Sequence, residues 1–228
     1  MAVLWSGETI IGIFKERPNR FQAIVEIEGV LETVHVPNTG RMSGLLAPGT
    51  EVLLVRSNNS KRKHRFSLTL IRKQGQWVCV YSALANRVFE DGVQLGKVRG
   101  IDGTLQREVK IGESRIDFTF EGEFSTFIEV KCVTYEEDGV AMFPDAPTLR
   151  GRKHIGELIR ATEEGKRGMV VFIIFMKGVT YFTPLEAVDP LFAEALKKAK
   201  QAGIELRAYD CTVNQEGIEL NQAIPIRL

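Results

Sequence analysis

The chain has 228 residues, of which 44% are hydrophobic and 26% charged, and its formal net charge is +1. These proportions are typical of a soluble globular protein with one large domain or two small ones. The longest strongly apolar stretch, residues 169–176, is far shorter than the roughly 20 residues of a membrane-spanning helix. Residues 1–12 lack the basic start and long apolar run of a signal peptide. The three cysteines are widely spaced without a C-x-x-C pattern, so we expect a cytoplasmic protein with reduced thiols.

Charge is distributed unevenly along the chain. Residues 1–80 carry 11 Lys and Arg against 6 Asp and Glu, whereas the rest carries 19 against 23. A basic half could bind a polyanion, and an acidic half could hold carboxylates for a metal ion. Chance unevenness of solvated surface charge would give the same counts, so both interpretations stay open.

The first third of the chain is predicted to be all-β. Short β-branched or aromatic runs indicate strands at residues 9–14, 21–27, 30–36, 52–55, 67–72 and 77–81. Turn sequences separate these runs, among them EG at 28–29, PG at 48–49 and QG at 74–75. Five or six short strands in about 80 residues favour a small barrel, and an OB-fold has this strand count. We therefore predict an OB-fold-like, nucleic-acid-binding domain over residues 1–82.

The pattern changes after residue 82 to alternating helices and strands. We expect helices at residues 84–93, 153–164 and 189–202, and strands at 108–111, 115–120, 126–133, 169–175 and 206–213. The run at 169–175 is continuously apolar, as in a strand that is buried on both faces. Residues 83–228 are therefore predicted to form a second, α/β domain of order α-β-β-β-α-β-α-β.

Three polar residues lie on a predicted β-hairpin of this second domain. Side chains two residues apart share a face of a strand, so Glu129 and Lys131 lie together and Asp117 can join them from the preceding strand. The opposite faces are predicted to be apolar, with Ile116, Phe118 and Phe120 on one strand and Ile128, Val130 and Cys132 on the other. Two neighbouring carboxylates repel each other unless a cation lies between them, so we predict a site for Mg²⁺ or Mn²⁺ held by Asp117 and Glu129.

Such a metal ion could polarise a phosphodiester and lower the pKa of an attacking water. Lys131 could orient that water or stabilise the developing negative charge. The pattern D…E-x-K on a hairpin between two helices is typical of the PD-(D/E)xK nuclease superfamily. Glu90, on the preceding helix, is a candidate third metal ligand by analogy with members of that superfamily. The alternative is a solvated polar face in which Glu129 and Lys131 form an ordinary surface pair.

Several blocks of sequence resemble the sugar fermentation stimulation protein A (SfsA) family. They are RPNRF at 17–21, HVPNTGRM at 35–42, KRK at 61–63, GESRIDF at 112–118, IEVK at 128–131, FPDAPT at 143–148 and RGRKH at 150–154. The resemblance implies an N-terminal OB-like domain joined to a restriction-endonuclease-like PD-(D/E)xK domain, DNA binding, and a nuclease by fold. The D…E-x-K residues match the family pattern. Cys132 stands where the family often has Ser.

Other polar residues are candidates for accessory roles in the same site. Asp145 could reach the metal ion or cap a turn, and His154 and Glu157 lie three residues apart on one predicted helix. Arg115, on the face of Asp117, could bind phosphate or neutralise a carboxylate. For each of these a structural role is the alternative.

Basic residues in turns and at a helix start are candidates for binding the nucleic-acid backbone. They are Arg17, Arg20, Arg41, Lys61, Arg62, Lys63, Arg150, Arg152 and Lys153. Backbone N–H groups at the start of the helix would assist the last three. Ordinary solvated charge is again the alternative.

The sequence therefore predicts a metal-dependent nuclease whose partner is nucleic acid, DNA first and RNA second, with no membrane partner. One alternative is a DNA-binding regulator of sugar-metabolism genes that performs no catalysis. Another is a metal-dependent phosphodiesterase for small nucleotides, in which the basic β-domain serves an interaction partner. The sequence does not define the oligomeric state, and a homodimer is compatible with it.

Overall fold

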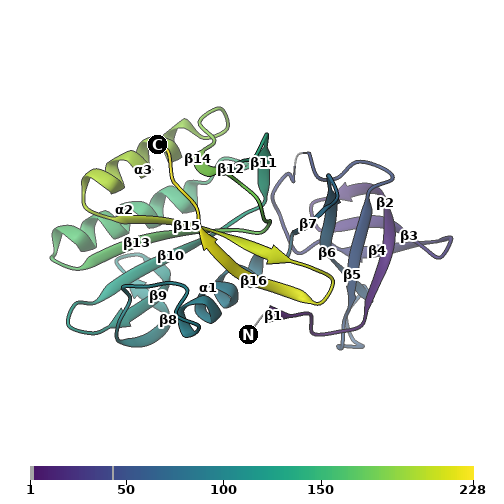
Figure 1. Ribbon diagram of the computed structural model, residues 1–228, viewed down its shortest axis with the longest axis horizontal. Coiled ribbons are helices and arrows are strands. Elements are labelled where there is room, and N and C mark those ends of the chain that lie inside the picture. Colours follow the sequence, from purple (N-terminus) through teal and green to yellow (C-terminus); the bar gives the residue numbers. More distant parts are fainter. Residues whose placement is uncertain (1–2, 43) are drawn as a thin grey trace.

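A computed structural model describes residues 3–42 and 44–228, which form a β-barrel and an α/β unit lying side by side (Figure 1). None of the helices in this part of the chain is both long and apolar enough to cross a membrane.

The N-terminal unit is a closed barrel, as predicted. Its strands are β2 (Thr9–Asn19), β3 (Gln22–Ile27), β4 (Val30–His35), β5 (Glu51–Arg56), β6 (Phe66–Lys73) and β7 (Gln76–Cys79). The order is β4-β3-β2-β5-β6-β7, and a pairing of β4 with β6 closes five of these strands into a ring. The predicted EG and QG turns have positive φ at both residues, which matches the twist of two-residue hairpins.

The C-terminal unit is a seven-stranded mixed sheet with helices on both faces. Its elements are α1 (Ala85–Gln94), β8 (Thr104–Ile111), β9 (Ser114–Glu121), β10 (Thr126–Val133), α2 (Leu149–Glu163), β13 (Arg167–Ile174), α3 (Pro190–Gln201), β15 (Glu205–Val213) and β16 (Gly217–Ala223), with β1 (Val3–Leu4) at one edge. The sheet order is β1-β16-β15-β13-β10-β9-β8. Strands β10, β13 and β15 are parallel, whereas β9 and β10 form the predicted antiparallel hairpin.

The two faces of this sheet have separate cores. Helix α1 packs with Phe118 and Ile128 in one cluster, whereas α2 and α3 pack with Phe172 and Ile174 in the other. The predicted order of three helices and five strands is therefore present, and the hairpin β9–β10 lies between α1 and α2.

Some elements were not predicted. Strands β11 (Tyr135–Glu137), β12 (Val140–Phe143) and β14 (Tyr181–Pro184) form a separate small sheet. They have only three or four residues each, too few for a recognisable period. Strand β16 was also not predicted. Helix α2 begins at Leu149, before the predicted residue 153, because the Thr148 side chain caps it by accepting a hydrogen bond from the Gly151 amide (3.0 Å).

The predicted first domain, residues 1–82, differs from the structure at its N-terminal end. Strand β1 pairs with β16 of the α/β sheet, not with the barrel, and Val3 lies against Ile218. Val3 is buried in the cluster that contains Phe89 and Phe118. The N-terminal segment therefore completes the second unit.

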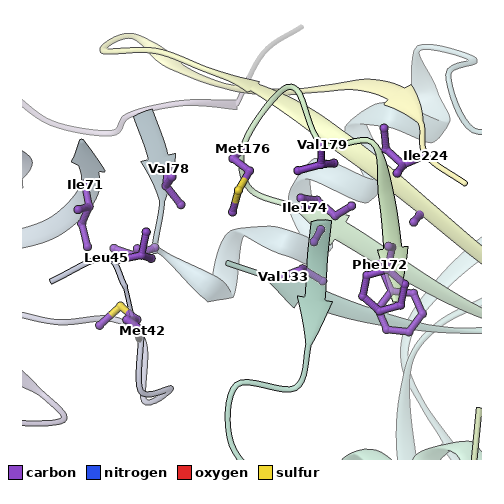
Figure 2. Packing of buried hydrophobic residues seen from close by; sticks show 14 of the residues in the cluster. Met42, Leu45, Ile71, Val78, Val133, Phe172, Ile174, Met176, Val179 and Ile224 are labelled. Atoms are coloured by element: carbon purple, nitrogen blue, oxygen red, sulfur yellow. The ribbon is translucent and has the colours of Figure 1, made fainter. Parts of the chain in front are cut away.

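The barrel and the α/β unit share one apolar core. Figure 2 shows Leu45 and Val78 of the barrel side facing Val133, Ile174 and Met176 of the α/β side, and all belong to a single buried cluster. A backbone bond from the Cys79 amide to the Phe175 carbonyl (2.9 Å) crosses the same boundary. A continuous core of this kind fixes the orientation of one unit relative to the other.

Candidate active site

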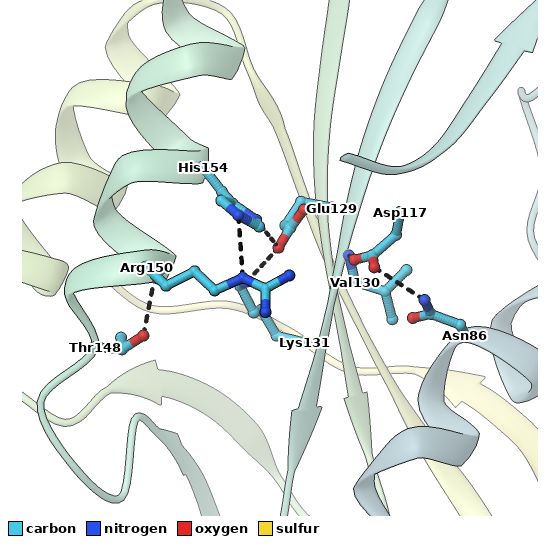
Figure 3. Close-up of polar contacts among 9 residues, drawn as sticks. Asn86, Asp117, Glu129, Val130, Lys131, Thr148, Arg150 and His154 are labelled. Carbon is cyan, nitrogen blue, oxygen red and sulfur yellow. Dashed lines mark hydrogen bonds and ion pairs between the residues drawn. The ribbon is translucent and has the colours of Figure 1, made fainter. Parts of the chain in front are cut away.

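The hairpin β9–β10 opens at Asp117. The two strands are paired from Thr126↔Phe120 to Ile128↔Phe118, and the pairing stops there. At the next position the side chain of Asp117 takes the place of a backbone partner, and its Oδ2 accepts a hydrogen bond from the Val130 amide (2.9 Å). Its Oδ1 accepts from Asn86 Nδ2 of α1 (2.9 Å), so the side chain is held from both sides (Figure 3).

This opening corrects one prediction about β9. Ile116, Phe118 and Phe120 were expected to share a face, but Ile116 packs in the cluster of α2, whereas Phe118 and Phe120 pack in the cluster of α1. The strand therefore changes face at Asp117, where its side chain replaces a backbone partner. The predicted apolar face of β10 is present, since Ile128 and Val130 are buried together and Cys132 packs against their cluster.

Glu129 and Lys131 lie together on the face of β10 that is covered by α2. Glu129 is only 2% exposed. Its Oε1 accepts hydrogen bonds from Lys131 Nζ and from His154 Nδ1, the latter at 2.5 Å. Its Oε2 is buried and has no hydrogen-bond partner among the described residues. A buried carboxylate oxygen without a partner is costly, so this atom is the natural position for a cationic ligand.

The two carboxylates have opposite pKa shifts. Burial and the nearby negative charge of Glu129 raise the pKa of Asp117. Burial also opposes ionisation of Glu129, but hydrogen bonds from His154 and Lys131, with the charge of Lys131, outweigh it and lower its pKa. Glu129 is therefore the stable anion of the pair, and ionised Asp117 is destabilised unless a further positive charge lies beside it.

The donor set fits a hard divalent cation. Two carboxylates with unequal pKa values and one unpartnered oxygen provide oxygen ligands, and Mg²⁺ is commonly held by one or two carboxylates with water completing its shell. Among the described residues, no three His, Cys, Asp or Glu side chains are gathered closely enough to hold a metal ion by themselves. Asp117 and Glu129 would thus be the protein ligands, with solvent or substrate oxygens for the remainder.

Glu90, the predicted third ligand, lies near Asp117 but has another partner. The two residues line one surface pocket together with Asn86. Glu90 forms an ion pair with Arg107 of β8. Asn86 was not predicted as a site residue. Its position four residues before Glu90, on the same helical face, was the available indication.

His154 contacts the site directly, and its tautomer follows from its neighbours. Arg150 Nε can only donate, and it lies 3.3 Å from His154 Nε2. Nε2 must then be the acceptor, so the ring proton is on Nδ1 and is donated to Glu129. Both ring nitrogens are occupied, and His154 is only 5% exposed. The imidazole therefore fixes which oxygen of Glu129 is left without a partner.

Three other predicted accessory residues lie elsewhere. Glu157 is buried beside Gly112, and its Oε1 lies 2.6 Å from Arg160 Nη2. Asp145 accepts a hydrogen bond from the Met42 amide (3.1 Å), so it joins the loop before α2 to the barrel. Arg115 is exposed on β9.

The basic residues predicted to bind nucleic acid divide into two groups. Some have structural partners: Arg17 donates to the carbonyls of Arg20, Asn38 and Gly40, Arg152 pairs with Asp189, and Lys153 pairs with Glu113. The others are exposed on the surface of the barrel or of α2: Arg20, Arg41, Lys61, Arg62, Lys63 and Arg150. Among these, Arg62 lies 3.4 Å from Ser67 Oγ, and Arg150 contacts His154. Arg20 lies over the exposed ring of Phe21, 4.8 Å from its centroid.

A barrel fused to this α/β unit defines a protein that combines an OB domain with a restriction-endonuclease-like domain. The family model described as the SfsA N-terminal OB domain matches residues 16–80, and the one described as the sugar fermentation stimulation protein RE domain matches residues 83–217. The chain belongs to the sugar fermentation stimulation protein (SfsA) family, and the predicted family and fold are confirmed.

Individual relatives match over nearly the whole chain. A sugar fermentation stimulation protein homologue from Clostridium botulinum (strain Langeland) is 43% identical over 94% of this chain and 95% of its own length. One from Caldanaerobacter subterraneus is 42% identical over 96% of this chain and 97% of its own. The solved structure of Pyrococcus furiosus SfsA in complex with Ca²⁺ is 31% identical, with a TM-score of 0.91 and full coverage of both chains.

Proposed function

We propose that this protein is a metal-dependent nuclease whose α/β unit hydrolyses phosphodiesters and whose barrel binds the nucleic-acid backbone. The observation that carries the proposal is the buried Oε2 of Glu129, which no described residue bonds, beside a carboxylate, Asp117, whose pKa is raised. Both features indicate a missing positive charge. The description of the Pyrococcus relative as a Ca²⁺ complex supports a hard divalent cation in this family.

Each residue of the hairpin has a separate task in the proposed reaction. Asp117 and Glu129 would hold Mg²⁺ or Mn²⁺, which supplies an activated water and polarises the phosphoryl oxygen when bound. Lys131 donates hydrogen bonds only, so beside Glu129 it would stabilise negative charge on the phosphate as the water attacks phosphorus and the ester oxygen leaves. Asn86 and the Val130 amide keep the Asp117 carboxylate oriented.

The barrel supplies sequence-independent contacts in this proposal. Lys61, Arg62 and Lys63 are exposed in one loop, and Arg20 with Phe21 presents a cation beside an aromatic ring. Charges of this kind bind phosphates and make affinity salt-dependent, whereas they carry little base specificity. Replacing the three loop residues with Ala should weaken DNA binding and flatten its dependence on salt concentration.

The direct test is cleavage of labelled single- and double-stranded DNA and RNA with Mg²⁺ or Mn²⁺ and with chelator. Lys131→Ala should reduce the cleavage rate about 100-fold or more, as removal of one charge-stabilising group does in other enzymes, and leave DNA affinity nearly unchanged. An exposed α2 residue without a role in the site gives the control, Glu163→Gln, which should cleave at the wild-type rate.

The outcomes separate the proposal from its alternatives. Metal-dependent cleavage that is lost on Glu129→Ala supports the nuclease and identifies the polymer. Salt-sensitive DNA binding without cleavage under any condition would favour a regulator that keeps the fold without catalysis. Turnover of a small diester that survives the loss of the barrel loop cations, with no cutting of polymers, would favour a nucleotide phosphodiesterase.

A further inference from the structure

Arg150 differs from the other cations at the start of α2. Within its first turns, Arg152 lies 3.6 Å from Asp189, and Lys153 lies 3.1 Å from Glu113. Arg150 is exposed and has no carboxylate partner among the described residues. Within the described part of the chain, its side chain makes one polar contact, from Nε to His154. The two terminal nitrogens, with four N–H donors, are left for a ligand.

The position of Arg150 relates this donor group to the proposed site. His154 links Arg150 to Glu129, because its Nε2 accepts from Arg150 and its Nδ1 donates to Glu129 Oε1. Lys131 reaches the same Oε1 directly. Figure 3 shows the side chain of Arg150 extending from α2, on the side of Glu129 away from Asp117. Lys131 therefore bonds Glu129 directly and Arg150 is linked to it through His154, so an exposed guanidinium lies at the edge of the proposed site.

We propose that Arg150 binds a phosphodiester of the substrate through its terminal nitrogens, and that His154 transmits this binding to Glu129. A planar guanidinium suits two oxygens of one phosphate. The 3.3 Å contact to His154 is at the long end for a hydrogen bond, so its length is sensitive to any movement of Arg150 on binding phosphate. His154 is a positioning residue, because it keeps Glu129 Oε1 occupied and directs Oε2 to the cation.

The inference rests on the proposed function for its substrate, but it is tested without metal and without cleavage. The probe is a thymidine dinucleotide with one phosphodiester, added in chelator up to roughly 10 mM, with thymidine as the control that lacks phosphate. The readout is the imidazole ¹⁵N resonances of the three histidines, and a His154→Gln variant assigns those of His154.

In the wild type, the dinucleotide should shift the Nε2 resonance of His154 in a saturable manner, and thymidine should not. Arg150→Lys keeps the charge but lacks the rigid planar fork with which Arg donates to the phosphate and the imidazole at once. We expect at least about tenfold weaker dinucleotide binding and no shift at His154. Arg160→Lys, at an exposed position of the same helix, is the matched control and should retain the shift.

Absence of dinucleotide binding, binding without a shift at His154, or a shift that persists in Arg150→Lys would each overturn the inference. The experiment also distinguishes failure of this inference from failure of the proposed nuclease function. If polymers are never cleaved but the Arg150-dependent shift is present, the phosphate site stands and the nuclease does not. If polymers are cleaved and the shift is absent, the nuclease stands and Arg150 is not its phosphate contact.

Discussion

Replacing Asp117 with Asn should stabilise the metal-free protein and abolish its stabilisation by metal. The substitution keeps the shape of the side chain. The new amide oxygen can accept from the Val130 amide, and its NH₂ group can donate to Asn86 once that amide flips. Only the charge of Asp117 is then removed, so the change in stability reports the electrostatic cost of its ionised form.

The magnitude follows from the proximity of the two carboxylates. Asp117 lies close enough to Glu129 for the negative charge of Glu129 to raise its pKa. Two carboxylates on the order of 7 Å apart repel by about 2 kcal/mol at an effective dielectric constant of about 20. Lys131 attracts Asp117 and offsets part of this, so we expect a net gain of about 1 kcal/mol. For a chain of this size that raises Tm by about 2–4 °C.

Thermal melts in chelator and in saturating Mn²⁺ or Ca²⁺ measure both effects. At a metal concentration about 100 times Kd, the wild type should gain about 2.7 kcal/mol, or about 5–11 °C, and Asp117→Asn should gain almost nothing. Glu163→Gln removes an exposed charge and should match the wild type in both conditions. A metal-free Asp117→Asn variant that melts below the wild type, or one that keeps the full metal shift, would refute the reasoning.

The same pair of proteins gives a pH dependence with a defined sign. Folding raises the pKa of Asp117, so its ionised form destabilises the native state above that pKa. The cost disappears as pH falls through the raised pKa. In chelator, the Tm advantage of Asp117→Asn should therefore be largest at neutral pH and shrink in mildly acidic buffer.

Two further substitutions test contacts in the rest of the molecule. Gly112→Ala should destabilise the protein by about 2–4 kcal/mol in urea denaturation, because Gly112 has φ +53° and a Cβ would lie 2.3 Å from Glu157. Gly165→Ala is the control, since Gly165 has φ +84° but open space around it, and it should cost only about 1 kcal/mol. Equal costs for the two substitutions would exclude the clash with Glu157. Lys73→Met should cost about 1–2 kcal/mol at neutral pH, since Lys73 pairs with Glu136 at 2.5 Å across the two units. Burial opposes ionisation of Glu136, but the hydrogen bond from Lys73 holds its pKa below the ordinary value. The stability difference between Lys73→Met and the wild type should therefore fade as pH drops through that lowered pKa. A stability difference that does not depend on pH would contradict the ion pair as its cause.

Period-two patterns predicted the parts of the site that lie within one strand. Glu129 and Lys131 share a face because alternate residues of any strand do, and the hairpin that brings Asp117 near them followed from a short polar turn. The location of Asp117 between the strands could not be predicted, since it depends on where the pairing of β9 with β10 ends.

Contacts between distant parts of the chain also could not be predicted from local sequence patterns. His154 was a candidate, but its bond to Glu129 depends on how α2 packs across β10. Asp145 could be placed on a loop, but its bond to Met42 depends on the docking of the barrel. Strand β1 has only two residues, and its partner lies more than 200 positions away.

The pairing of β1 with β16 has a consequence for the order in which the molecule is built. Val3 is synthesised before the strands of the barrel, but Ile218, its partner, is synthesised after the barrel and after α3. The edge of the larger sheet therefore stays open during synthesis of both the barrel and the helices, with Val3 exposed instead of buried. If the chain folds as it emerges, the barrel forms first, and β1 can pair only after β16 has been synthesised.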